Sequence, residues 1–145
     1  MKCDSMKCPC PKAFGLCVVA GFIFIFVTDF IIHGQLLAGM YENTSHLWRP
    51  EEEMVMPWMF AVQILIVLIT ASIYGPGHEG KGIGEGVRFG VMLGALFAVM
   101  MASSYAWMPI PIQLAIGWGA AGFVQGLGLG VIYSLLYKQK QKTET

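Results

Sequence analysis

Long segments without any charged residue dominate this sequence. Residues 54–74, 89–107 and 112–137 carry no charge, and residues 13–28 form a fourth such segment. An α-helix of about 20 mostly apolar residues crosses the hydrocarbon core of a bilayer, and the four segments meet or approach that length. Membrane β-strands alternate apolar and polar residues over about ten positions, whereas residues 22–27 are apolar on every side. The sequence therefore predicts four transmembrane helices.

Composition supports this class. The chain of 145 residues is 56% hydrophobic and only 12% charged, which is too apolar for a soluble domain of this size. We expect an all-α integral membrane protein, a single domain of residues 1–145 folded as a compact bundle of two helical hairpins. The expected helices and tails are, in chain order, a tail at 1–12, helices at about 13–40, 50–74, 87–107 and 111–137, and a basic tail at 138–145. The first apolar segment is longer than the core of a usual signal peptide, so we expect it to be retained.

The basic residues are distributed unevenly around the predicted helices. Arg49 alone falls on one side, and all the others fall on the opposite side: Lys2, Lys7, Lys12, Lys81, Arg88, Lys138, Lys140 and Lys142. By the positive-inside rule, both termini and the central loop are predicted to lie in the cytoplasm.

Small residues recur at every fourth position in the last two predicted helices. These residues are Gly86, Gly90, Gly94 and Ala98 in one helix, and Gly122, Gly126 and Gly130 in the other. Such glycine stripes let two membrane helices approach closely. We expect a tight antiparallel hairpin, and a stripe could also bind a second copy or a larger membrane complex.

An acidic and a basic side chain lie near the end of the first predicted helix. Asp29 and His33 are four residues apart, which places them on one helical face. A carboxylate at the bilayer centre costs about 2.5 to 3.5 kcal/mol on insertion scales, so Asp29 requires a partner. In the structural interpretation, Asp29 accepts a hydrogen bond from His33 or pairs with Arg49. Alternatively, the pair exchanges protons, because histidine titrates near neutrality.

Cofactor binding is a further alternative for this pair. With His46, the two residues offer ligands for copper or zinc, and five methionines would supply a soft rim suited to copper: Met40, Met54, Met56, Met59 and Met108. His33 is also a candidate ligand for a haem- or chlorophyll-type macrocycle. The N-terminal Cys3, Cys8 and Cys10 are a second candidate soft-metal site, although their spacing matches no common zinc arrangement. An unstructured tail without a role is the alternative for these cysteines.

Three further features concern polar residues outside this pair. Gln63 and Gln125 lie at membrane depth, where we expect interhelical hydrogen bonds. Pro50 with the acidic residues 51–53 predicts a helix start. The glycine-rich segment 75–86 lacks the strand–loop–helix context of a phosphate-binding loop, so we expect a flexible hairpin with a solvated His78.

The stretch D-F-I-I-H-G, followed by L-W-R-P-E and three more apolar helices, resembles small uncharacterised bacterial four-helix inner-membrane proteins. The resemblance covers the first helix and the first loop. It implies a location in a bacterial cytoplasmic (inner) membrane and implies no activity.

These features favour a non-catalytic accessory or scaffold subunit over an enzyme. Such a subunit would pack through its glycine stripes against itself or a larger membrane complex, with lipid and protein as partners and no nucleic acid. The alternative function is a small metal- or proton-handling membrane protein that uses Asp29 and His33.

Overall fold

The computed structural model describes residues 11–137, and this part of the chain is helical without β-strands. The long helices are α1 (Pro11–Ile31), α3 (Met56–Gly77), α4 (Ile83–Ala102) and α5 (Ile112–Leu136). Shorter elements connect them: the π-helix η1 (Ile32–Leu36), α2 (Ala38–Asn43), and the 3₁₀ turns η2 (Ser45–Leu47), η3 (Glu51–Glu53) and η4 (Ser103–Ala106). Four helical spans are long and apolar enough to cross a membrane, which confirms the all-α class and the predicted number of spans within the described residues.

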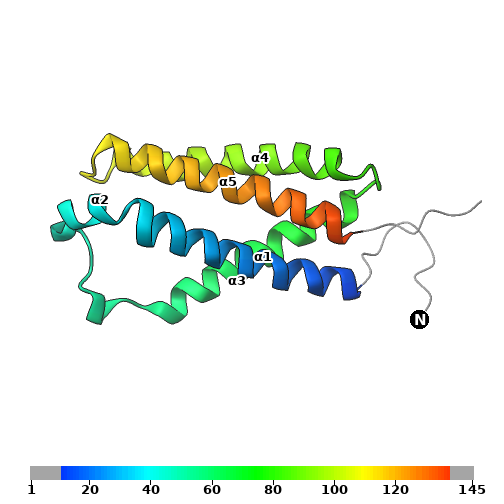
Figure 1. The fold of residues 1–145 in the computed structure, drawn as a ribbon, viewed down its shortest axis with the longest axis horizontal. Helices are drawn as coiled ribbons and strands as arrows, with labels where there is room; N and C mark the ends of the chain where they lie inside the picture. The colour runs from blue at the N-terminus through cyan, green and yellow to red at the C-terminus, as the bar shows by residue number, and fades with distance from the viewer. Residues whose placement is uncertain (1–10, 138–145) are drawn as a thin grey trace, which may run out of the picture.

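The four long helices run roughly along one axis, with α3 inclined to the others (Figure 1). The start of α1 and the end of α5 lie at the same end of the bundle, which we call the terminal end; the opposite end, with α2 and η4, is the distal end. At the terminal end α3 packs closely on its neighbours, since the ring of Tyr74 lies 5.1 Å from Phe89 and 5.7 Å from Tyr133. Towards the distal end α3 diverges from α4 and α5 (Figure 1).

The glycine stripes lie inside the hairpin of α4 and α5. A Cβ added to Gly90 would lie 2.8 Å from the carbonyl oxygen of Leu127, and one added to Gly126 would overlap the backbone of Gly94. Gly86 faces Gly130 in the same way. Glycine is required at these positions because the two backbones touch. The predicted tight hairpin is confirmed, and these glycines are covered while it remains closed.

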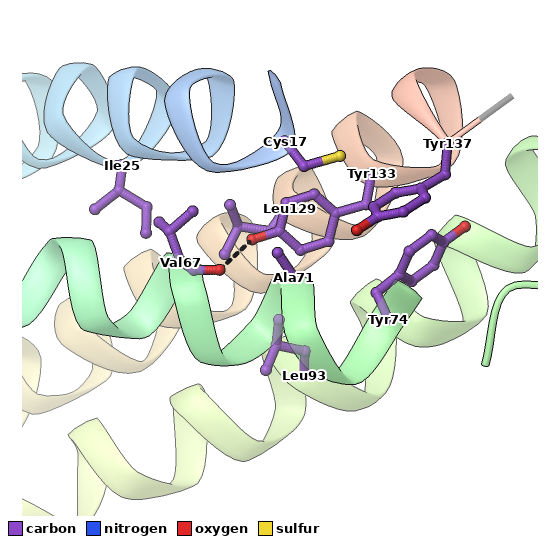
Figure 2. Close-up of a cluster of buried hydrophobic side chains, with 9 residues drawn as sticks. All are labelled: Cys17, Ile25, Val67, Ala71, Tyr74, Leu93, Leu129, Tyr133 and Tyr137. Atoms are coloured by element: carbon purple, nitrogen blue, oxygen red, sulfur yellow. Dashed lines mark hydrogen bonds between the residues drawn. The ribbon is translucent and has the colours of Figure 1, made fainter. Parts of the chain in front are cut away.

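A layered core joins α1, α3 and α5 (Figure 2). Ile25, Val67 and Leu129 are each at most 3% exposed, and Tyr133 and Cys17 are fully buried nearer the terminal end. Successive layers lie about one helical turn apart, because side chains at i and i+4 share a face. The hydroxyl of Tyr133, a fully buried tyrosine of this core, lies 2.8 Å from Thr70 Oγ1 and so has a polar partner.

Several helix boundaries differ from the sequence-based expectation. Helix α4 begins at Ile83, before the predicted residue 87, and ends at Ala102, where the 3₁₀ turn η4 follows, instead of continuing to residue 107. The first helix changes to a π-helix at Ile32 and ends near Leu36, instead of continuing to residue 40. Helix α3 begins at Met56, with Pro57 in its first turn, and residues 51–53 form a separate 3₁₀ turn. The predicted start at Pro50 was wrong because a second proline lies nearer the apolar segment and is equally suited to a first turn.

The glycine-rich connection between α3 and α4 is organised around one carboxylate. Glu85 accepts hydrogen bonds from the backbone N–H groups of Glu79 (2.7 Å) and Lys81 (2.9 Å). His78 Nδ1 lies 3.3 Å from the same carboxylate, and the His78 side chain is only 6% exposed, so the prediction of a solvated histidine was wrong. Gly80 and Gly82 have φ angles of 76° and 74°, which favour glycine. This loop therefore does bind an anion, but the anion is the chain's own Glu85.

The hairpin predicts a specific sensitivity to added volume. Gly126→Ala should lower the free energy of unfolding by about 1 to 3 kcal/mol, because the new Cβ must displace the α4 backbone. Gly84→Ala is the matched control: nothing lies within 4 Å of its Cβ. The control should keep or slightly raise stability, since alanine is the better helix former by about 1 kcal/mol. Unfolding in mixed micelles, followed by circular dichroism, measures the free energy of unfolding of both variants. Equal effects of the two substitutions would contradict this packing.

Candidate functional site

The carboxylate of Asp29 joins three helices at the distal half of the bundle. Gln63 of α3 donates a hydrogen bond from Nε2 to Asp29 Oδ2 at 2.6 Å, and Gln125 of α5 donates from Nε2 to Oδ1 at 2.5 Å. An ionised carboxylate only accepts hydrogen bonds, so two amide N–H donors match its charged form. The predicted interhelical hydrogen bonds of the two glutamines are confirmed, and they converge on one residue.

His33 lies one turn further along, inside the π-helix η1. Its Nε2 is 3.8 Å from Asp29 Oδ1, which is an electrostatic contact and is too long for a direct hydrogen bond. A single hydroxyl oxygen could bridge a gap of this size. The extra residue of a π-helix changes the direction of the side chains within it, and such segments are frequent at functional sites. The backbone irregularity therefore coincides with the candidate site.

Tyr41 connects His33 to α5. The Tyr41 hydroxyl lies 2.6 Å from His33 Nδ1 and accepts a hydrogen bond of 2.6 Å from Trp118 Nε1. Burial raises the pKa of Tyr41, so its hydroxyl keeps its proton at neutral pH. The indole N–H of Trp118 and the hydroxyl proton of Tyr41 both form hydrogen bonds if Trp118 donates to Tyr41 and Tyr41 donates to His33 Nδ1. The imidazole proton is then on Nε2, the nitrogen that faces Asp29.

An aromatic cluster holds Tyr41 in place. Its ring lies 5.6 Å from that of Trp48 and 6.5 Å from that of Trp118, and the two indoles are 5.9 Å apart. Trp48 Nε1 donates to Thr44 Oγ1 at 2.9 Å, so the short helix α2 and the turn that follows it form one packed unit. This unit explains why L-W-R-P follows the first helix: its tryptophan fixes the tyrosine that orients His33.

The polar residues line a cavity of about 1080 Å³. Asp29, His33, Tyr41, Gln63 and Gln125 form its polar part. The rest of the lining is mostly apolar and comes from the distal halves of α3, α4 and α5, with Trp58, Met59, Val62, Phe97, Met100 and Met101 among its residues. The cavity thus occupies the space left where α3 diverges from α4.

Arg49 also lines this cavity. Within residues 11–137, no carboxylate lies within 4 Å of its guanidinium group, so the expected pairing with Asp29 does not form. Of the two partners expected for Asp29, His33 lies in electrostatic contact with it and Arg49 does not, and the hydrogen-bond donors are Gln63 and Gln125. The signal for these donors was present, because Gln63 and Gln125 were the polar groups within the apolar segments of two other helices.

Only some of the predicted metal ligands lie close to one another in the structure. His46 is exposed in η2 and is not part of the cavity lining. No group of three or more His, Cys, Asp or Glu side chains within the described residues is placed to hold a metal ion. Of the five candidate methionines, Met54 and Met59 line the cavity. Cys3, Cys8 and Cys10 lie outside the described residues.

Comparison with known proteins adds no constraint to this geometry. No family model, no curated protein and no solved structure matches the chain.

The link between Gln63 and Asp29 predicts an energetic coupling. Gln63→Leu should lower the free energy of unfolding by about 1.5 to 3 kcal/mol, the range for a hydrogen bond to a charged group. In an Asp29→Leu background the same substitution should cost less than about 0.5 kcal/mol, because the bond is already absent. Gln35→Leu, at an exposed position outside the cavity lining, is the control. A Gln63→Leu effect of the same size in both backgrounds would show that the two residues are not coupled.

Proposed function

We propose that this chain is a four-span membrane protein whose distal half is a binding site that exchanges protons through Asp29 and His33. One observation carries the proposal: the hydrogen-bonded series from Trp118 through Tyr41 to His33 ends beside a carboxylate that lines a large cavity. Titratable residues at membrane depth are expensive to place there, and they commonly mark proton or substrate sites.

The setting that we propose is a bacterial cytoplasmic membrane, with the distal end facing outwards. Lys12, Lys81 and Arg88 flank the spans at the terminal end, whereas Arg49 is in the distal connection. This distribution supports a cytoplasmic terminal end by the positive-inside rule. The Asp29 site would then exchange protons with the outer aqueous phase through Tyr41 and His33.

The core argues against proton conduction through the protein. On each of the three helices that meet at Asp29, the next layer inwards is apolar: Ile25, Val67 and Leu129. A proton cannot cross such a layer without a polar group or water to accept it. We therefore propose local proton binding coupled to an occupant of the cavity, in place of a transmembrane proton path.

Titration of histidine resonances tests this function. In ¹⁵N-histidine-labelled protein, a signal that His33→Gln removes should titrate with pH, and its midpoint should move in Asp29→Asn because the neighbouring charge is gone. Glu42→Gln, an exposed carboxylate beside Tyr41 in the sequence, should leave the midpoint unchanged. In liposomes the protein should add no proton leak. A His33 titration midpoint that is the same in the unaltered protein and in Asp29→Asn would contradict the proposal. A proton leak that Asp29→Asn abolishes would also contradict it.

An accessory subunit is the second candidate function, and the exposure of α3 favours it. Leu65, Ile69 and Ile73 are 55%, 57% and 60% exposed, and their spacing of four places them on one face. This face, in place of the covered glycine stripes, is the surface that a second copy or a larger membrane complex would contact. A lipid-facing stripe is the alternative use of the same residues.

Native mass spectrometry after gentle detergent extraction distinguishes a protein-binding face on α3 from a lipid-facing one. An accessory subunit should be extracted in an assembly heavier than the 15.9 kDa chain. Replacement of Leu65, Ile69 and Ile73 by alanine should release the chain from it, whereas replacement of Val91, Met92 and Val99 on the exposed face of α4 should not. Extraction of the unaltered protein as a monomer would exclude the accessory role.

A further inference from the structure

The orientation of Gln63 decides which polar groups an occupant of the cavity can reach. Gln63 is 5% exposed, and its amide nitrogen must face Asp29 because the carboxylate only accepts. Its Oε1 is covered and has no hydrogen-bond donor among residues 11–137. An occupant therefore meets the side chains of Asp29 and His33, which are 31% and 37% exposed, and a hydroxyl or N–H group on it would donate to the carboxylate.

The charges around the cavity favour a neutral occupant. Asp29 and Arg49 both line it, so a cation would lie near the guanidinium group and an anion near the carboxylate. The donors available to an occupant are His33 Nε2–H and Arg49, and the acceptors are the carboxylate oxygens of Asp29. A neutral head group that carries both a hydrogen-bond donor and an acceptor oxygen can pair with these acceptors and donors of the cavity.

The apolar walls suit a ring with a hydrocarbon tail. Trp58, Phe97 and Trp118 supply flat aromatic surfaces, and Met59 and Met100 adapt to irregular shapes. A volume of about 1080 Å³ accommodates more than one ring. Trp58 of α3 is 70% exposed and Met100 of α4 is 57% exposed. Within a bilayer, this border between the two helices faces hydrocarbon, so a lipid-soluble molecule can enter sideways.

We propose that the cavity binds a neutral, lipid-soluble quinol or quinone, with its ring oxygens between Gln63, Asp29 and His33 and its tail towards the border of α3 and α4. The inference rests on the proposed function, since it names the occupant of the same site. A quinol hydroxyl donates to the carboxylate of Asp29, which Gln63 holds in position, and a quinone carbonyl accepts from His33 Nε2–H. Only binding is proposed, with no electron transfer by this chain.

Binding of decylbenzoquinol and decylbenzoquinone to the full-length protein in detergent tests this inference. Quenching of tryptophan fluorescence reports occupancy, because Trp58 and Trp118 line the cavity. We expect saturable binding that Gln63→Leu weakens at least tenfold, about 1.4 kcal/mol, while Gln35→Leu leaves it unchanged. Val62→Phe, which fills the cavity without touching the polar residues, should also abolish binding, and Ile64→Phe on the exposed face of α3 should not.

Three outcomes would overturn the inference. The first is binding unaffected by both Gln63→Leu and Val62→Phe in correctly folded protein. The second is tighter binding of tetraphenylphosphonium, a lipophilic cation, which would make this a cation site. The third is no binding of either quinone form, with phospholipid retained in the purified protein, which would make the cavity a lipid site. In all three cases the coupling of the His33 titration to Asp29 remains a separate test, so the proposed function can stand while the inference fails.

Discussion

The carboxylate of Asp29, shared by three helices, is the constraint on which the rest of this structure depends. A carboxylate among apolar helices needs hydrogen-bond donors, and here Gln63 and Gln125 each donate one amide N–H to it. The carboxylate therefore fixes the position of α1 relative to both α3 and α5. Towards its distal end α3 diverges from α4 and α5 but stays against α1, where the ring of Phe60 lies 5.9 Å from that of Phe26. The polar junction and this ring contact together hold the distal half of α3 to α1.

The bundle is consequently built of two unlike halves. The terminal half is a packed core in which Tyr133, Val67 and Leu129 are fully buried (Figure 2). The distal half has a smaller buried cluster around Leu37, Ile110 and Leu114, and beside it keeps a cavity whose polar residues are held by hydrogen bonds and aromatic contacts. Packed cores hold one arrangement, whereas a site that admits an occupant must leave volume unfilled. The Asp29 layer is the boundary between the two halves.

Glycine performs two different tasks in this chain. In α4 and α5 its lack of a side chain allows backbone contact, which makes that hairpin the rigid support for α1. In the connection between α3 and α4, Gly80 and Gly82 permit a turn whose N–H groups reach Glu85. Both tasks are internal to the chain, so the high glycine content by itself points to neither a nucleotide site nor a partner.

The sequence by itself determined the all-helical class, the four helices long and apolar enough to cross a membrane, and the α4–α5 hairpin. Segment length, absence of charge and a four-residue repeat of small residues are local properties, and local properties survive any change of tertiary arrangement. It also identified Asp29, His33, Gln63 and Gln125 as polar groups that need partners. Only the tertiary structure decided that the two glutamines share Asp29, that Tyr41 orients His33, and that Arg49 lines the cavity with no carboxylate within 4 Å among residues 11–137. Those outcomes depend on the rotation of each helix and on a π-helical turn, which are set by packing between segments distant in the sequence.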